Sequence, residues 1–130
     1  MKTILLDTNF LLIPGNLGVD IFREIERIAD FSYKVCVIDR TVDELHNIIE
    51  RQTGAHREAA KLGLKLLDTE GVERIKTETL KNVDELIVKT ANSEDFIVAT
   101  QDKGLKDKLR SKMVPLIVLR QKKHLIIQRP

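Results

Sequence analysis

The chain has 130 residues, 42% hydrophobic and 32% charged, which suits one folded domain and not a disordered chain. Its single cysteine, Cys36, excludes an internal disulfide framework and a four-cysteine zinc site. No apolar stretch approaches the ~20 residues of a membrane span, and Asp7 comes too early for a signal peptide. We therefore expect a single domain, residues 1–130, of a soluble cytoplasmic protein that does not bind membranes.

The net charge of +2 conceals an asymmetry along the chain. Residues 1–100 carry 13 Lys and Arg against 18 Asp and Glu, a charge of −5, whereas residues 101–130 carry 9 against 2, a charge of +7. A basic C-terminal segment on an acidic body suggests a polyanionic partner. Charge alone also allows the plainer interpretation, which is a solvated basic helix face.

Short apolar runs alternate with amphipathic stretches along the chain. In chain order the patterns predict a strand at Lys2–Leu6, a break at Pro14-Gly15-Asn16, a helix at Val19–Ala29, a strand at Tyr33–Ile38, helices at Thr41–Gln52 and Ala55–Leu67, a weak strand at Val72–Ile75, a helix at Val83–Ala91, a strand at Phe96–Thr100, a helix at Lys103–Lys112, a strand at Leu116–Leu119 and an added edge strand at Leu125–Ile127. This alternation predicts an α/β fold with three α/β/α layers around a central parallel sheet.

Acidic residues fall where the predicted strands end. Asp7 directly follows the first strand, and Asp102 follows the fourth. Glu44 lies in the first turn of the helix after the second strand, and Asp84 in the first turn of the helix before the fourth. Ligands bind at the carboxyl ends of parallel strands, so these acids converge if the first and fourth strands are neighbours. Clustered carboxylates call for a hard cation, and oxygen ligands favour Mg²⁺ or Mn²⁺ over zinc.

Each of these acids also has a purely structural interpretation. Capping boxes fit Thr41–Glu44 and Asn82–Glu85. Asp84 lies where a carboxylate favours the helix dipole, and Asp7 and Asp102 could cap the segments that follow them. The four together are harder to explain structurally, because all of them cluster at the functional edge of the predicted sheet.

Several other classes of site lack their motifs. The chain has neither GxGxxG nor GxxxxGK[ST], so dinucleotide and P-loop nucleotide binding lack their glycine loops. No nucleophile elbow is present. His46, His56 and His124 lack zinc-ligand spacing with one another or with Cys36. At 4% aromatic content, a stacking platform for single-stranded bases is not expected to dominate.

Four segments resemble the motifs of the PIN-domain ribonucleases. They are ILLDTNF at residues 4–10, VDEL at 42–45, DELI at 84–87 and FIVATQDKGL at 96–105. The order and spacing of all four motifs make the resemblance specific, and it runs from Lys2 to about Leu119. The tail, residues 114–130, is further similar to the PIN proteins of the small-ribosomal-subunit processome.

The resemblance implies a parallel sheet with strand order 3-2-1-4-5 and the hydrolysis of RNA phosphodiester bonds with Mg²⁺ or Mn²⁺. Position by position, it assigns catalytic and metal-binding roles to Asp7, Glu44, Asp84 and Asp102. Its supporting polar residues, expected near the substrate, correspond to Thr8, Asn9 and Thr100. The chain departs from the family at Gln101, where many members have Asn, and we expect that side chain to point away from the site.

Basic residues near the C-terminus are candidates to hold an RNA backbone without reading its sequence. They are Lys103, Lys106, Arg110, Arg120, Lys122 and Lys123. Besides RNA, the resemblance implies ribosome-assembly proteins or an antitoxin as partners. Dimers are common in the family, although no self-complementary surface can be recognised in the sequence.

The alternatives differ in class. The favoured hypothesis is an endoribonuclease, acting in rRNA processing or as the toxin of a toxin–antitoxin pair. A non-catalytic RNA-binding module on the same scaffold is less favoured, because degenerate members lose acids and all four are present here. A phosphoacceptor receiver domain also has acids and a Thr at strand ends. It requires an acidic pair near residue ten and an Asp after the third strand, where this chain has Thr8-Asn9 and Lys76-Thr77.

Overall fold

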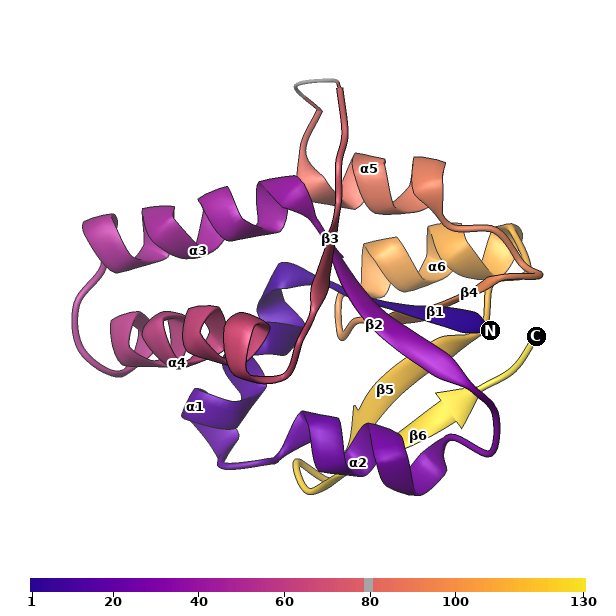
Figure 1. Ribbon diagram of the computed structural model, residues 1–130, viewed down its shortest axis with the longest axis horizontal. Coiled ribbons are helices and arrows are strands. Elements are labelled where there is room, and N and C mark those ends of the chain that lie inside the picture. The colour runs from indigo at the N-terminus through magenta and orange to yellow at the C-terminus, as the bar shows by residue number, and fades with distance from the viewer. Residues whose placement is uncertain (79–80) are drawn as a thin grey trace.

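The computed structural model describes residues 1–78 and 81–130. Its elements are β1 (Lys2–Leu6), the 3₁₀ helix η1 (Thr8–Leu12), α1 (Ile13–Leu17), α2 (Ile21–Ile28), β2 (Tyr33–Ile38), α3 (Asp39–Arg51), α4 (Ala55–Thr69), β3 (Glu73–Ile75), α5 (Val83–Thr90), β4 (Phe96–Ala99), α6 (Lys103–Ser111), β5 (Leu116–Arg120) and β6 (His124–Gln128) (Figure 1). Among these residues no helix combines the length and the apolar character needed to cross a bilayer.

The six strands form one sheet in the order β3-β2-β1-β4-β5-β6. Every neighbouring pair is parallel except β5 and β6, which form an antiparallel hairpin at one edge. The expected order 3-2-1-4-5 and the added edge strand are both confirmed. Because β1 pairs with β4, the carboxyl ends of the first and fourth strands lie side by side.

Helices cover both faces of the sheet, so its central strands are apolar on both sides. On β1, Ile4 and Leu6 pack into a core with η1, α1, α2 and α4, whereas Leu5 packs with α5 and α6 on the opposite face. Figure 1 shows α5 and α6 on one side of the strands, and α2 and α4 on the other. The three-layer prediction is therefore confirmed, and α3 and α5 lie beside the carboxyl end of β1.

The predicted break at Pro14-Gly15-Asn16 is wrong, because these residues lie inside α1. Proline is tolerated there because the first turn of a helix leaves its N–H groups without helical partners. Gly15 is required by packing, since a Cβ atom at this position would lie 2.5 Å from the Cα atom of Ala59 on α4. The helix ends at Gly18, whose φ of 68° is left-handed.

The start of α3 also differs from the expectation. The helix begins at Asp39, with Ile38 as its N-cap, so the capping box expected at Thr41–Glu44 is absent and Glu44 lies in the second turn. Thr41 is instead buried inside the helix, facing Thr8. The other expected cap is confirmed, because Asn82 Oδ1 accepts a hydrogen bond from the Glu85 N–H at 2.9 Å.

The contact between α1 and α4 allows a direct test. Gly15→Ala should lower the free energy of unfolding by about 1–3 kcal/mol, because the added methyl overpacks the helix contact. Gly104→Ala is the matched control: its Cβ would meet only Asp102 Oδ1 at 3.4 Å, and the better helix former should stabilise by up to about 1 kcal/mol. Urea denaturation measures both, and equal stabilities for the two variants would contradict the packing argument.

Candidate active site

Asp7 occupies the end of the central strand β1 and is only 3% exposed. Its carboxylate accepts hydrogen bonds from the Thr8 N–H at 2.8 Å and from the Thr100 hydroxyl at 2.9 Å. Burial raises the pKa of Asp7 to about 6, and the negative charges of Asp84 and Glu44 add to the effect, while the two hydrogen bonds oppose it. The chain thus holds a carboxylate in a place that disfavours its charge.

Thr100 connects Asp7 with Asp102. Its hydroxyl, fully buried after β4, donates to Asp7 and accepts a hydrogen bond from the Asp102 N–H at 3.1 Å. Asp102 is the N-cap of α6, because its Oδ1 accepts the Leu105 N–H at 2.7 Å. The structural interpretation of Asp102 as a helix cap is therefore correct, and its second carboxylate oxygen makes no hydrogen bond within the described residues.

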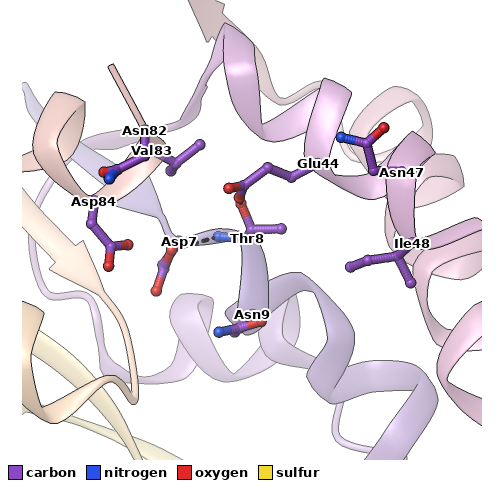
Figure 2. A pocket seen from close by; sticks show the side chains of 9 residues that line it. All are labelled: Asp7, Thr8, Asn9, Glu44, Asn47, Ile48, Asn82, Val83 and Asp84. Carbon is purple, nitrogen blue, oxygen red and sulfur yellow. Dashed lines mark hydrogen bonds between the residues drawn. The ribbon is translucent and has the colours of Figure 1, made fainter. Parts of the chain in front are cut away.

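Glu44 reaches the site from α3. Its Oε1 accepts a hydrogen bond from the Thr8 hydroxyl, which also lies 3.4 Å from the Thr41 hydroxyl. Thr8 is buried, so this contact fixes the end of β1 against α3. The carboxylates of Asp7 and Glu44 are thereby held on opposite sides of one threonine (Figure 2).

Asp84 comes from the first turn of α5, which Asn82 caps. Partial burial, followed by the negative charge of Asp102, raises the pKa of Asp84, while the ammonium group of Lys108 lowers it. The Asp84 side chain is exposed to solvent, and Figure 2 shows its carboxylate beside that of Asp7. The four predicted acids therefore influence one another as a chain, from Glu44 through Asp7 and Asp84 to Asp102.

Three of the four acids line a cavity of about 500 Å³. The lining residues are Asp7, Thr8, Asn9, Glu44, Asn47, Ile48, Asn82, Val83 and Asp84 (Figure 2). Asp102 is not among the lining residues. The acids that neighbour the predicted ones are turned elsewhere, since Glu85 bonds to Asn82 at 3.1 Å and Asp43 pairs with Arg40 at 3.5 Å.

The family resemblance implies a divalent metal, and the donor set can be tested for it. All four candidate ligands are carboxylates, which suit Mg²⁺ or Mn²⁺, and in the part of the chain that the structure describes none pairs with a lysine or arginine. Among residues 1–78 and 81–130, however, no three His, Cys, Asp or Glu side chains come close enough to form a ready-made metal site. The charge and the donor chemistry therefore fit a divalent cation, whereas the described side chains are not gathered closely around one point.

The basic residues expected to contact RNA are distributed unevenly. Lys103 lies at the start of α6, where it pairs with Asp107 at 3.1 Å, and Lys106 follows one turn later. Arg110 lies about 10 Å from Lys103 along the helix axis. Its guanidinium bonds to Asp107 at 3.4 Å and to Gln128 on β6 at 2.9 Å, so it ties α6 to the edge strand.

The β5–β6 turn presents Arg120, Lys122 and Lys123 as exposed side chains. Since β5 runs parallel to β4, this turn lies at the same edge of the sheet as Asp7 and Asp102. Gln101, which follows β4, contacts the end of β5, because its Oε1 accepts a hydrogen bond from the Leu119 N–H at 2.7 Å. Its side chain therefore points away from the acids, as expected.

The sequence analysis missed several residues around the acids. Lys108 influences Asp84, yet nothing in the sequence separates it from the other lysines of α6. Asn47 lines the cavity because it follows Glu44 by three residues on one helix face, a spacing that could have been recognised. Asp39 accepts hydrogen bonds from the Thr77 N–H at 2.9 Å and hydroxyl at 2.6 Å, which ties the start of α3 to the chain just after β3.

The strand order and the acidic edge together match one class of protein. The chain matches the family described as "PIN like domain" over residues 4–122 and belongs to it. It is similar to Ribonuclease VapC4 of Methanocaldococcus jannaschii, with 30% identity over 125 residues and 95% of each chain covered. The structure of the PIN domain endonuclease Utp24 is similar in fold, with a TM-score of 0.79 and 23% identity, over 98% of this chain and 92% of that chain.

The raised pKa of Asp7 predicts a pH-dependent stability. The pKa of Asp7 in the folded chain, about 6, lies above the ordinary value of 3.8. Ionisation therefore opposes folding, and the stability falls as the pH rises between these values. Without metal, Asp7→Asn should therefore stabilise the fold at pH 8 by up to about 3 kcal/mol, and the gain should vanish near pH 4. Urea denaturation in EDTA measures this, with Asp30→Asn as an exposed control. The same gain at both pH values would contradict the argument.

Proposed function

We propose that this chain is a metal-dependent endoribonuclease that hydrolyses RNA phosphodiester bonds at the carboxylate cavity. The observation that carries the proposal is the convergence of Asp7, Glu44 and Asp84 on one cavity in a chain that is 30% identical to a ribonuclease over nearly its whole length. Asp102 joins this group through its charge on Asp84 and through Thr100. We assign the catalytic roles to these four acids.

Asp7, Glu44, Asp84 and Asp102 would hold Mg²⁺ or Mn²⁺, which supplies positive charge that acidifies water and offsets the charge of the phosphodiester. Thr8 and Thr100 orient the Asp7 carboxylate from two sides, so that its position does not depend on the substrate. No lysine, arginine or histidine is among the residues that line the cavity in the described part of the chain. An RNA phosphate would therefore meet only negative charge there in the absence of the cation.

Two finer hypotheses about the substrate and partners extend this proposal. In one, the chain processes ribosomal RNA together with ribosome-assembly proteins; in the other, it is a toxin-type ribonuclease that an antitoxin inhibits. The first is expected to leave unprocessed rRNA precursors when the protein is depleted. The second is expected to arrest growth when the protein is expressed alone, because the cleavage is then uninhibited.

A substitution at Asp102 can separate the proposed catalytic role of this residue from its role as a helix cap. In Asp102→Asn, the amide oxygen can still cap α6, because Asn caps about as well as Asp, but the acidic group loses one charge. We expect single-turnover cleavage of a structured RNA in Mn²⁺ to fall roughly 100-fold or more, and Mn²⁺ binding by calorimetry to weaken. RNA binding should persist, because less negative charge faces the phosphates.

The matched control is Asp107→Asn, which removes the same charge from an exposed position of α6. Its cleavage should stay close to that of the native chain. Wild-type cleavage by a folded Asp102→Asn protein would eliminate the mechanism. No cleavage by the native chain on any RNA, with binding retained, would favour the non-catalytic module.

The basic hairpin predicts a change in salt dependence. Replacing Arg120, Lys122 and Lys123 together by Ala should weaken RNA binding and reduce the slope of log affinity against log salt by roughly 0.7 per lost phosphate contact. A filter-binding salt series measures the slope. A triple variant of Arg51, Lys61 and Lys65, on α3 and α4, removes the same charge elsewhere. Equal slopes for the two triple variants would mean that the hairpin is a solvated surface.

A further inference from the structure

The cavity extends beyond the acids along α3. Glu44, Asn47 and Ile48 follow one another at i, i+3 and i+4, which places them on the same side of the helix, and all three line the cavity. Figure 2 shows Glu44 next to Thr8 at the acidic end, with Asn47 and Ile48 further along α3. A ligand that places its phosphate at the acids therefore has room for a neighbouring group against this part of α3.

The polar side chains that line the cavity differ in their hydrogen bonding. The Asn82 amide is bonded through both its oxygen and its nitrogen to Glu85, and the Thr8 hydroxyl donates to Glu44. The exposed Asn47 amide, by contrast, makes no hydrogen bond within residues 1–78 and 81–130, although it lines the cavity. An amide group offers two donor hydrogens and an acceptor oxygen, so Asn47 can bond to a ligand at both.

The charge of the cavity limits which chemical group of a ligand can bind at the α3 end. Three carboxylates line the cavity, and its described lining contains no basic side chain, so a second phosphate is disfavoured at the α3 end. The half-buried Ile48 adds apolar surface beside the Asn47 amide. A planar, uncharged group with an apolar face and a hydrogen-bonding edge suits this surface, and an RNA base has those properties. Bases in unpaired RNA are recognised through such contacts to their face and edge.

We propose that Asn47 and Ile48 form a nucleobase subsite beside the acids, in which Ile48 packs against the face of a base and Asn47 selects the base by its edge. The inference rests on the proposed ribonuclease activity, because the base would belong to a nucleotide next to the cleaved bond. Asn47 is thus a specificity-determining residue, and the acids are not expected to select sequence.

The experiment sequences the ends produced from an RNA library of random sequence by the native chain, Asn47→Ala and His46→Ala. His46 is the matched control, because it is the exposed neighbour of Asn47 on α3 and does not line the cavity. The native chain and His46→Ala should prefer one base at a position next to the cleaved bond. In Asn47→Ala this preference should fall about tenfold, the discrimination expected of a good amide–base pair.

Asn47→Asp sharpens the test, since it keeps the shape of the side chain but removes both donor hydrogens. It should change which base is preferred. A base preference that stays the same in Asn47→Ala and Asn47→Asp would overturn the proposal, as would a native chain that cleaves RNA without any base preference next to the bond.

A binding measurement separates this inference from the nuclease proposal. The measurement uses Asp7→Asn protein, because binding can be measured without cleavage. Fluorescence anisotropy gives the affinity of this protein, with and without Asn47→Ala, for four short RNAs that differ at one base. Discrimination that depends on Asn47, in a native chain that does not cleave, would support the subsite and refute the nuclease. Equal affinities for all four RNAs, or no binding, would refute the subsite.

Discussion

The buried carboxylate of Asp7 is the constraint on which the rest of the site depends. It lies at the end of the central strand, where an unpaired charge is costly, and the Thr8 N–H and the Thr100 hydroxyl are its hydrogen-bond donors. Thr100 follows β4, so the compensation exists only because β4 is the direct neighbour of β1. The remaining cost is visible in the raised pKa of Asp7, which a bound cation would relieve.

Helix packing then determines which side chains meet this carboxylate. Gly63 on α4 allows a close approach to η1, since a Cβ atom there would lie 2.7 Å from the Leu11 carbonyl oxygen. Leu11 belongs to the same 3₁₀ helix as Thr8, whose hydroxyl donates a hydrogen bond to Glu44 on α3. Asp39, at the start of α3, accepts two hydrogen bonds from Thr77, just after β3. Asp7 and Glu44, which come from separate elements, are thus held by backbone and side-chain hydrogen bonds within the protein that involve no substrate.

Charge is divided between the cavity and its surroundings. The cavity lining is acidic, whereas α6 and the β5–β6 turn carry exposed lysines and arginines outside it. Gln121 and Lys122 both have left-handed φ angles, 54° and 55°, which cost about 1–2 kcal/mol per residue in a chain without glycine there. The tight turn nevertheless places basic side chains at the sheet edge that bears Asp7. A polyanion would be attracted to the basic side chains of α6 and the β5–β6 turn, and a cation to the acidic cavity.

Local patterns in the chain were sufficient to predict the strands, the layers and the acids at the carboxyl edge, because β-branched runs, helical spacing and residues at strand ends are properties of neighbouring residues. The strand order was expected from the family motifs. The helix across Pro14-Gly15-Asn16, the buried position of Thr41 and the cavity-lining role of Asn47 were not predicted. The first two depend on contacts between segments far apart in the chain, such as Gly15 against Ala59, about which a local pattern contains no information. The spacing of Asn47 from Glu44 is local, but it does not show that a cavity lies beside that helix face.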